Sequence, residues 1–274
     1  PAGTARVVMV EDTDGGDDVV RVLRCGGKTN ICPRGQDIRA GQPVLNAGTL
    51  LNELAVANLL GCGITAVKVR RPVRAAVLST GDELAASPDE LAPGRIIDTN
   101  SPMLDGLCRR RGIEVVRRAR LADDRKYLAA AMIEAKAQAD ILVVTGGVSA
   151  GDFDFVGEAF ADAGMEILFR RVAIKPGKPL TVAADASCVA LGLPGNPVAV
   201  FLHFHLFVLR AAAALTGATP PCRPLRLPLA DEHRRRSPDR TDFVPCRLDD
   251  AGHIEAIRSH GSAHLLALSA ADGF

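Results

Sequence analysis

The chain has 274 residues, of which 47% are hydrophobic and 24% are charged, a composition typical of a folded globular protein rather than a disordered one. Its 33 basic and 32 acidic residues leave a net charge of +1, without the basic excess that nucleic-acid-binding proteins usually carry. The seven cysteines include no Cys-x-x-Cys pair, so neither a disulfide framework nor a zinc site is indicated. We therefore expect a cytoplasmic protein with no nucleic-acid partner.

The sequence predicts no membrane-spanning segment. The longest stretch without charged residues runs from 189 to 209, and Pro-Gly-Asn-Pro interrupts it. About 12 apolar-leaning residues remain, whereas a spanning helix needs about 20. We expect a buried helix there and no membrane partner. Because the chain starts with Pro1 and stops at Phe274, we also expect truncation at both ends.

Residues 1–40 contain two β-like runs, at 6–10 and 19–24, which a polar, glycine-bearing turn separates. Short runs of this kind predict a partial β-rich domain.

Residues 41–72 show a different pattern. Apolar residues recur at helical spacing between Leu50 and Leu59, which predicts a helix with Thr49 or Asn52 as its cap. We expect this part of the chain to be a helical linker.

From residue 73 onward, predicted strands alternate with predicted helices. The strands are expected at 73–78, 113–119 and 141–144, and the helices at 100–111, 125–138, 155–163 and 197–215. This alternation predicts a parallel sheet covered by helices on both faces, with loops at the carboxyl ends of the strands carrying the chemistry. The α/β domain is expected to cover residues 73–218.

The helical pattern disappears after residue 219. Short β-like runs follow at 225–229, 241–248 and 253–257. Residues 219–274 are therefore expected to form a partial C-terminal β-domain.

A glycine-rich loop at 143–152 reads Val-Val-Thr-Gly-Gly-Val-Ser-Ala-Gly-Asp. It follows a buried strand and precedes a helix, a position where backbone N–H groups and the positive end of the helix can hold a phosphate. The alternative is an ordinary strand-to-helix turn, because the full dinucleotide and Walker patterns are absent.

Acidic and amide residues border the neighbouring elements. Thr-Gly-Asp-Glu at 80–83 ends a strand, and Asp98 and Asn100 open the next helix. Asp98 or Asn100 could simply cap that helix. If the loops converge at one edge of the sheet, acids beside a phosphate imply a divalent cation between them.

Lysine is scarce, because 27 of the 33 basic residues are arginine. Two of the six lysines, Lys175 and Lys178, lie in the motif Lys-Pro-Gly-Lys-Pro, where prolines fix the loop. Ammonium groups on a rigid loop suit an oxyanion, and a solvated surface loop is the alternative.

Two features of the adjoining helix are less specific. The turn Leu-Pro-Gly-Asn-Pro at 193–197 is either a structural turn or shapes a substrate site. His203 and His205 lie two apart on the apolar helix and cannot share a face, so we expect core or interface residues rather than ligands.

Five motifs occur in a characteristic order along the chain: Ser-Thr-Gly-Asp-Glu-Leu, Asp-Thr-Asn, Thr-Gly-Gly-Val-Ser-x-Gly-x-x-Asp, Lys-Pro-Gly-Lys-Pro and Leu-Pro-Gly-Asn-Pro. This ordered set resembles the molybdopterin molybdenumtransferase family, the MoeA and gephyrin E-domain type. The resemblance covers essentially the whole chain. It implies an α/β fold in which a three-layer, parallel-sheet molybdopterin-binding domain of the MogA-like type is flanked by small β-rich domains. On that basis, residues 1–40 correspond to part of domain II, 41–72 to a domain I segment, 73–218 to domain III and 219–274 to part of domain IV.

The resemblance implies the last step of molybdenum cofactor synthesis. Adenylylated molybdopterin and molybdate would bind, the phosphoanhydride would be cleaved with Mg²⁺, and the metal would enter the dithiolene as AMP is released. It also implies a homodimer with its active site between subunits, and an upstream molybdopterin adenylyltransferase as a partner.

Individual residues carry over from the family motifs. The catalytic positions are Asp154, Glu83, Asp37 and Asp123, of which Asp154 and Glu83 also match the cation-binding positions. The molybdate-binding positions are Lys175, Lys178, Arg240 and Ser262. The positions for binding the cofactor precursor are Gly81, Asp82, Asp98, Asn100, Thr145, Gly146, Gly147, Ser149, Gly151, Pro194, Gly195, Asn196 and Pro197.

Two other functions stay open at this point. A molybdopterin adenylyltransferase would use the glycine-rich loop to receive ATP, although the flanking β-domains and the lysine-bearing loop argue against it. A non-catalytic cofactor-binding or scaffold fragment would bind its ligand without cleaving it.

Overall fold

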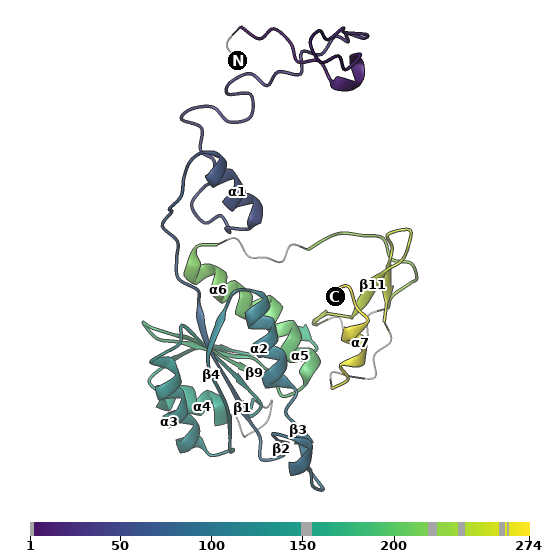
Figure 1. Ribbon diagram of the computed structural model, residues 1–274. Helices are drawn as coiled ribbons and strands as arrows, with labels where there is room; N and C mark the ends of the chain where they lie inside the picture. Colours follow the sequence, from purple (N-terminus) through teal and green to yellow (C-terminus); the bar gives the residue numbers. More distant parts are fainter. Residues whose placement is uncertain (1–2, 149–154, 219–223, 235–238, 258–260, 262) are drawn as a thin grey trace. The chain divides into compact units, whose positions relative to one another are not determined.

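The computed structural model describes residues 3–148, 155–218, 224–234, 239–257, 261 and 263–274. The chain divides into two compact units, Pro1–Val67 and Lys68–Phe274, which Figure 1 shows as a ribbon.

The described residues of the first unit form turns and extended segments with little regular structure. The 3-10 turn η1 spans Val10–Asp12, and Thr13 pairs with Val22 in an isolated antiparallel bridge. The expectation of strands at 6–10 and 19–24 is therefore wrong. Val19 is 73% exposed, and a strand without a face to bury gains little from its β propensity.

The helix α1, Glu53–Gly61, is the regular element expected in this unit. Its cap is Asn52 rather than Thr49, because the Asn52 side chain accepts a hydrogen bond from the Ala55 amide at 2.9 Å. Ala55 and Leu59 are buried one turn apart, as the helical spacing predicts.

A six-stranded sheet forms the centre of the described part of the second unit, in the order β4-β1-β5-β9-β8-β6. The strands are β1 (Arg74–Thr80), β4 (Glu114–Leu121), β5 (Ile141–Thr145), β6 (Glu166–Arg170), β8 (Thr181–Ala184) and β9 (Val189–Leu193). The first four strands in the sheet order run parallel to one another, as expected.

The sheet is mixed rather than wholly parallel, because β8 is antiparallel to β9 and β6 is antiparallel to β8. The turn between β8 and β9 explains this difference. Its Asp185 side chain accepts hydrogen bonds from the amides of Ser187 and Cys188, which makes a tight hairpin. A parallel connection would need a crossover of a dozen or more residues.

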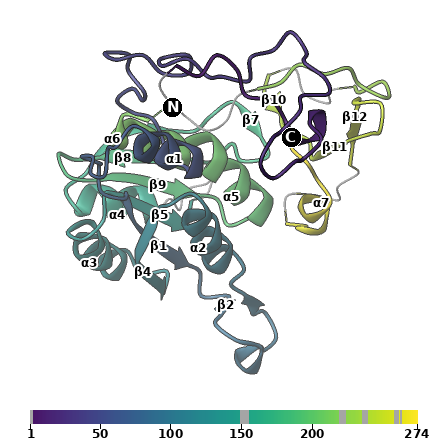
Figure 2. The same cartoon turned by 45° about the horizontal axis from the view of Figure 1, so that its top comes forward.

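Helices cover both faces of the sheet, which gives three layers (Figures 1 and 2). On one face lie α3 (Arg125–Lys136) and α4 (Phe155–Asp162). On the other lie α2 (Asn100–Arg110) and a long helix made of α5 (Pro197–His203), the π-helical segment η3 (Phe204–Val208) and α6 (Leu209–Thr216).

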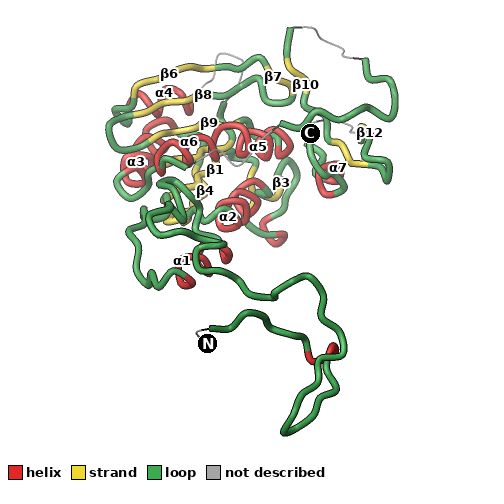
Figure 3. Tube along the Cα trace, turned by 90° about the horizontal axis from the view of Figure 1, so that it is seen from above, coloured by secondary structure: helices red, strands yellow, loops and turns green. Residues whose placement is uncertain are grey.

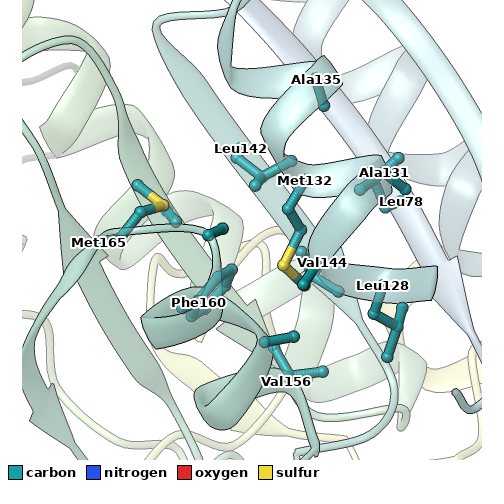
Figure 4. Close-up of a cluster of buried hydrophobic side chains, with 14 of the residues drawn as sticks. Leu78, Leu128, Ala131, Met132, Ala135, Leu142, Val144, Val156, Phe160 and Met165 are labelled. Atoms are coloured by element: carbon teal, nitrogen blue, oxygen red, sulfur yellow. The ribbon is translucent and has the colours of Figure 1, made fainter. Parts of the chain in front are cut away.

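Alternate side chains of the central strands supply the two halves of the core. Leu78 of β1 packs with α3 and α4, in the cluster around Met132 and Phe160 that Figure 4 shows. Its neighbour Val77 packs on the opposite face with residues of α2 and α5, Leu104 among them. This alternation is the period-two pattern of a strand that is buried on both faces.

The segment Pro197–Thr216 is long and apolar enough to cross a membrane by length and composition alone. In this chain it is a core helix, because Val200, Phe204 and Val208 are fully buried against the sheet. The expectation of a buried helix is confirmed.

Short elements complete the second unit. β2 (Leu84–Ala85) pairs with β3 (Ile96–Ile97), β7 (Ile174–Lys175) with β10 (Thr241–Asp242), and β11 (Cys246–Leu248) with β12 (Ile254–Ala256), while η2 (Pro88–Glu90) and α7 (Leu266–Ser269) are single turns. No strand forms at the described residues 225–229, where one was expected. The only strand-like pairing of this segment with other described residues is a single bridge from Leu229 to Ile254. The turn α7 was not expected from the sequence.

Candidate functional site

Loops that follow four strands meet at one edge of the sheet. Because β4, β1, β5 and β9 are parallel, their carboxyl ends share that edge. Contacts join the loops directly: the Gly146 amide donates to the Leu193 carbonyl at 3.2 Å, and the Thr80 hydroxyl donates to Asp123 and to the Ala122 carbonyl. We refer to this edge as the carboxyl edge.

The loop containing the two lysines emerges at the same edge. Arg170, at the end of β6, pairs with Thr181, at the start of β8, and Thr181 pairs with Gly192 near the end of β9. The connection between β6 and β8 therefore leaves and re-enters the sheet at the carboxyl edge. A wholly parallel sheet would not have joined these two strands by a loop at one edge.

Gly146 is required where β5 ends. It has a φ of +87°, and a Cβ at this position would lie 2.0 Å from the carbonyl oxygen of Thr80. Backbone of β1 and β5 thus approaches too closely for any side chain. This close approach brings Thr145, Gly146 and Gly147 beside the loop that follows β1.

Asn100 connects two of the predicted segments. Its side-chain amide donates to the Gly195 carbonyl at 2.7 Å, which ties the start of α2 to the Leu-Pro-Gly-Asn-Pro turn. Its Oδ1 atom is buried and has no hydrogen-bond partner among the described residues. A buried acceptor without a partner is uncommon in folded proteins. The Oδ1 atom of Asn100 therefore suits a hydrogen bond from a donor on a bound ligand.

Asp98 serves the local structure instead. One carboxylate oxygen accepts from the Asn100 and Ser101 amides at the start of α2, and the other accepts from the Ser79 and Ser101 hydroxyls. The geometry favours the capping alternative for Asp98, because both of its oxygens are engaged by the chain itself.

Three carboxylates gather beside the end of β1. Asp82 accepts from the Asp123 amide at 3.3 Å, Asp123 accepts from Thr80, and the Glu83 carboxylate lies against Gly81. Asp82 and Glu83 are exposed, and Asp123 is half-buried. These acids thus lie beside the end of the strand whose last residue, Thr80, lies against Gly146 at the start of the glycine-rich loop.

The donor chemistry of these acids fits Mg²⁺, although they do not form a complete metal cage. Among the described residues, no group of three acidic, histidine or cysteine side chains is placed to hold a metal ion. Mg²⁺ commonly uses one or two carboxylates, with water and substrate phosphates supplying its remaining ligands. The carboxylates of Glu83 and Asp123 are therefore of the chemical kind that such a site uses.

The tail of the second unit reaches the lysine-bearing loop through a two-stranded pairing. β10 pairs in parallel with β7: the Thr241 amide donates to the Ala173 carbonyl at 2.8 Å, and the Phe243 amide donates to the Lys175 carbonyl at 2.7 Å. Figure 3 shows the two strands side by side. Arg240 directly precedes β10, so the pairing brings it to the same segment as Lys175.

The lysine loop, which we define as residues 175–179, presents its cations at different depths. Lys175 is half-buried and Lys178 is exposed, and neither forms an ion pair with another described residue. The Val172 amide donates to the Lys178 carbonyl at 3.1 Å and closes the base of the loop.

Five other predicted residues belong to the first unit or lie outside the described residues. Asp37 belongs to the first unit, where it lines an open hollow together with Cys32 and Cys62. Ser149, Gly151, Asp154 and Ser262 lie outside the described residues.

The sequence interpretation missed two structural roles. In the sequence Thr80 is only one member of the Ser-Thr-Gly-Asp-Glu-Leu motif, yet its hydroxyl links β1 to Asp123. His203 is expected to be a core or interface residue; it is buried, and it also contacts the lysine loop. Position alone in the sequence could not reveal either contact, because each depends on a strand or loop distant in the chain.

Comparison with known proteins matches three regions of the chain. Residues 76–214 match the family model for a probable molybdopterin binding domain, residues 1–63 that for the MoeA N-terminal region (domain I and II), and residues 228–274 that for the MoeA C-terminal region (domain IV).

Individual relatives agree with these matches. The molybdopterin molybdenumtransferase of Staphylococcus epidermidis is 34% identical over 241 residues, covering 87% of this chain and 57% of the relative. That of Staphylococcus aureus strain Mu50 is 37% identical over 219 residues, covering 80% and 52%. The chain thus spans a little over half the length of the curated relatives it matches.

Solved structures show the same relationship. The molybdopterin biosynthesis MoeA protein of Pyrococcus horikoshii OT3 superposes with a TM-score of 0.77 at 30% identity, covering 99% of this chain and 66% of that protein. A molybdenum cofactor biosynthesis protein of Pyrococcus furiosus superposes with a TM-score of 0.65 at 27% identity, covering 86% and 73%. Because the matches extend from the first residues to the last and include the strands that form the carboxyl edge, this chain belongs to the MoeA family.

Proposed function

We propose that the chain acts in molybdenum insertion, the transfer of molybdate into adenylylated molybdopterin with release of AMP. The name of the Staphylococcus relatives, molybdopterin molybdenumtransferase, supports this proposal. Within it, the substrates are the adenylylated pterin and the oxyanion, and the protein works as a cytoplasmic homodimer downstream of a molybdopterin adenylyltransferase.

One observation carries the proposal: the glycine-rich loop and the lysine loop, to which we assign the two anionic substrates, open at the same edge of the sheet. The glycine-rich loop after β5 lies beside the loop after β1, and the lysine loop emerges at that edge between β6 and β8. A reaction that joins a phosphoanhydride substrate to a second anion needs both to bind close together. The carboxyl edge supplies that arrangement.

The cationic side chains suit the smaller anion. Lys175 and Lys178 present ammonium groups without an ion-pair partner in the described parts of the chain, and Arg240 adds a guanidinium from the tail. Their charges would offset the negative charge of molybdate, and the β7–β10 pairing would hold the two segments together. We assign the oxyanion to this part of the edge.

The opposite part of the edge suits the pterin nucleotide. Asn100 and the turn containing Gly195 would contact the pterin nucleotide, and the glycine-rich loop, which packs closely on Thr80 at Gly146 and Gly147, would hold its phosphates. Glu83 and Asp123, together with Asp154, would hold Mg²⁺, which would neutralise phosphate charge when bound.

An assay of nucleotide release tests the proposal. The purified chain is incubated with adenylylated molybdopterin and Mg²⁺, and AMP is measured with and without molybdate. We expect AMP release that depends on molybdate. Binding of the pterin nucleotide without AMP release would overturn the proposal in favour of a binding module, and adenylylation of molybdopterin by ATP would overturn it in favour of an adenylyltransferase.

A further inference from the structure

A buried histidine is bonded to the lysine loop. His203 of α5 has no exposed surface, and its Nε2 atom lies 2.8 Å from the carbonyl oxygen of Gly177. Because a carbonyl oxygen only accepts, Nε2 must carry the proton and donate it. Burial lowers the pKa of His203 to about 4, so the imidazole is a neutral donor at physiological pH.

Gly177, whose carbonyl oxygen accepts this hydrogen bond, has a backbone conformation that favours glycine. Gly177 has a φ of +101°, and a Cβ at that position would lie 2.5 Å from the Nε2 atom of His203. Any other residue would therefore be strained in its backbone and would collide with the ring. The close packing of Gly177 on the His203 ring thus requires glycine at position 177.

A second contact to the ring comes from the same long helix. Phe207 packs edge-on against it, with ring centroids 5.5 Å apart. The Nδ1 atom is buried and has no hydrogen-bond partner among the described residues. An apolar residue at position 203 would not carry the unpaired Nδ1 acceptor, whose burial is unfavourable. Histidine at this position therefore needs a compensating interaction. The bond to Gly177 is the interaction that an apolar residue could not replace.

The helix that carries His203 also borders the other part of the site. α5 begins at Pro197, directly after the turn in which the Gly195 carbonyl accepts from Asn100. One rigid element therefore contacts the nucleotide-side turn at its first residue and the lysine loop less than two turns later. A side chain that anchors the loop to this helix fixes the loop relative to that turn.

We propose that His203 is a positioning residue that holds the lysine loop, through Gly177, in the conformation that binds the oxyanion. The nature of the oxyanion, molybdate, rests on the proposed function. The anchoring of the loop does not, because it follows from the contact itself.

Two substitutions separate the hydrogen bond from the packing. His203→Gln keeps a side-chain N–H that can reach the Gly177 carbonyl, whereas His203→Met has a similar length without a donor. His205→Met is the matched control, because His205 lies on the same helix and has no bond to the lysine loop in the described residues. Thermal unfolding establishes that each variant is folded.

Hydrogen exchange tests the anchoring without any ligand. The Val172 amide, which donates to the Lys178 carbonyl, reports on closure of the loop. We expect faster exchange at Val172 in His203→Met, and parent-like exchange in His203→Gln and His205→Met. Unchanged exchange in a folded His203→Met would overturn the anchoring. If His203→Met does not fold, Gly177→Ala breaks the same contact from the loop, and unchanged exchange there has the same meaning.

Molybdate titration then tests the consequence for binding. Loss of a hydrogen bond that positions the loop should weaken molybdate binding by about tenfold in His203→Met, with recovery in His203→Gln. Parent-like affinity in His203→Met would overturn the positioning role while the proposed function stands. A parent chain that binds no molybdate would instead contradict the proposed function, and the exchange experiment would still decide whether His203 anchors the loop.

Discussion

The side-chain amide of Asn100 donates to the carbonyl oxygen of Gly195 at 2.7 Å, a bond between residues 95 positions apart. The sequence left Asn100 as either a helix cap or a contact for the cofactor precursor. The structure gives the capping role to Asp98, because Asp98 accepts from the first amides of α2. Asn100 is thereby left to join α2 to the turn that precedes α5.

Replacing Asn100 should therefore destabilise the chain through this bond. Asn100→Ala removes the donor and leaves the Gly195 carbonyl without its partner, which should cost about 1–2 kcal/mol of unfolding free energy. Asn100→Asp should cost at least as much, because a carboxylate faces the carbonyl with an acceptor where a donor is needed. Urea unfolding measures both, and parent-like stability of Asn100→Asp would contradict the assignment.

Gly146 and Gly195 form a matched pair for testing the close approach of β1 and β5. Gly146→Ala should lose about 3 kcal/mol of stability, because its Cβ meets the Thr80 carbonyl at 2.0 Å and its φ is positive. Gly195→Ala meets its nearest atom at 3.9 Å, so it should stay within about 1 kcal/mol of the parent. Equal denaturation midpoints for the two variants would show that the backbones are not in tight contact.

Removing the Asp98 carboxylate should loosen the start of α2. Asp98→Ala deletes the cap and the carboxylate that accepts from the Ser79 and Ser101 hydroxyls, which keep only their contact with each other, so we expect a loss of about 2 kcal/mol. If Asp98 instead served mainly to bind the substrate, the variant would lose nucleotide affinity with its denaturation midpoint unchanged. Chemical unfolding and nucleotide titration together distinguish these results.

Acid sensitivity should arise in part at Asp185, in the hairpin between β8 and β9. The Lys136 ammonium donates to this carboxylate at 2.7 Å, and with the Ser187 amide it holds the pKa of Asp185 well below its usual range. As the pH falls below about 4, the unfolded chain takes up this proton first, so the stabilisation present at neutral pH is lost.

Asp185→Asn isolates that contribution. At pH 7 the variant should be less stable than the parent by about 1–2 kcal/mol, and the difference should shrink as the pH is lowered toward 3. Urea unfolding across this range measures it. A difference that is the same at pH 7 and pH 3 would exclude Asp185 as a source of the pH dependence.

Much of the second unit could be predicted from sequence because its signals are local. The strand at 141–144 is a buried apolar run and was expected within one residue of β5, Ile141–Thr145. The helix at 100–111 was likewise expected close to α2, Asn100–Arg110. Once the strands are parallel, convergence of the loops after β1, β5 and β9 follows from topology.

The parts that could not be predicted depend on contacts across the fold. The antiparallel direction of β8 follows from the hairpin around Asp185, and the place of the lysine loop follows from that direction. The pairing of β10 with β7 joins segments more than 60 residues apart. In the first unit, β-like runs lack a buried face, so residue type alone predicted strands that do not form.

The most direct test of the account is calorimetric titration of the chain with molybdate. The parent should bind it at a saturable site, and Lys175→Ala should weaken binding by about tenfold or more, because a cation in contact with the anion is lost. Lys126→Ala, which removes an exposed lysine from α3, should bind as the parent does. Equal molybdate affinity in the parent, Lys175→Ala and Lys126→Ala, or no saturable binding by the parent, would contradict the assignment of the lysine loop to the oxyanion.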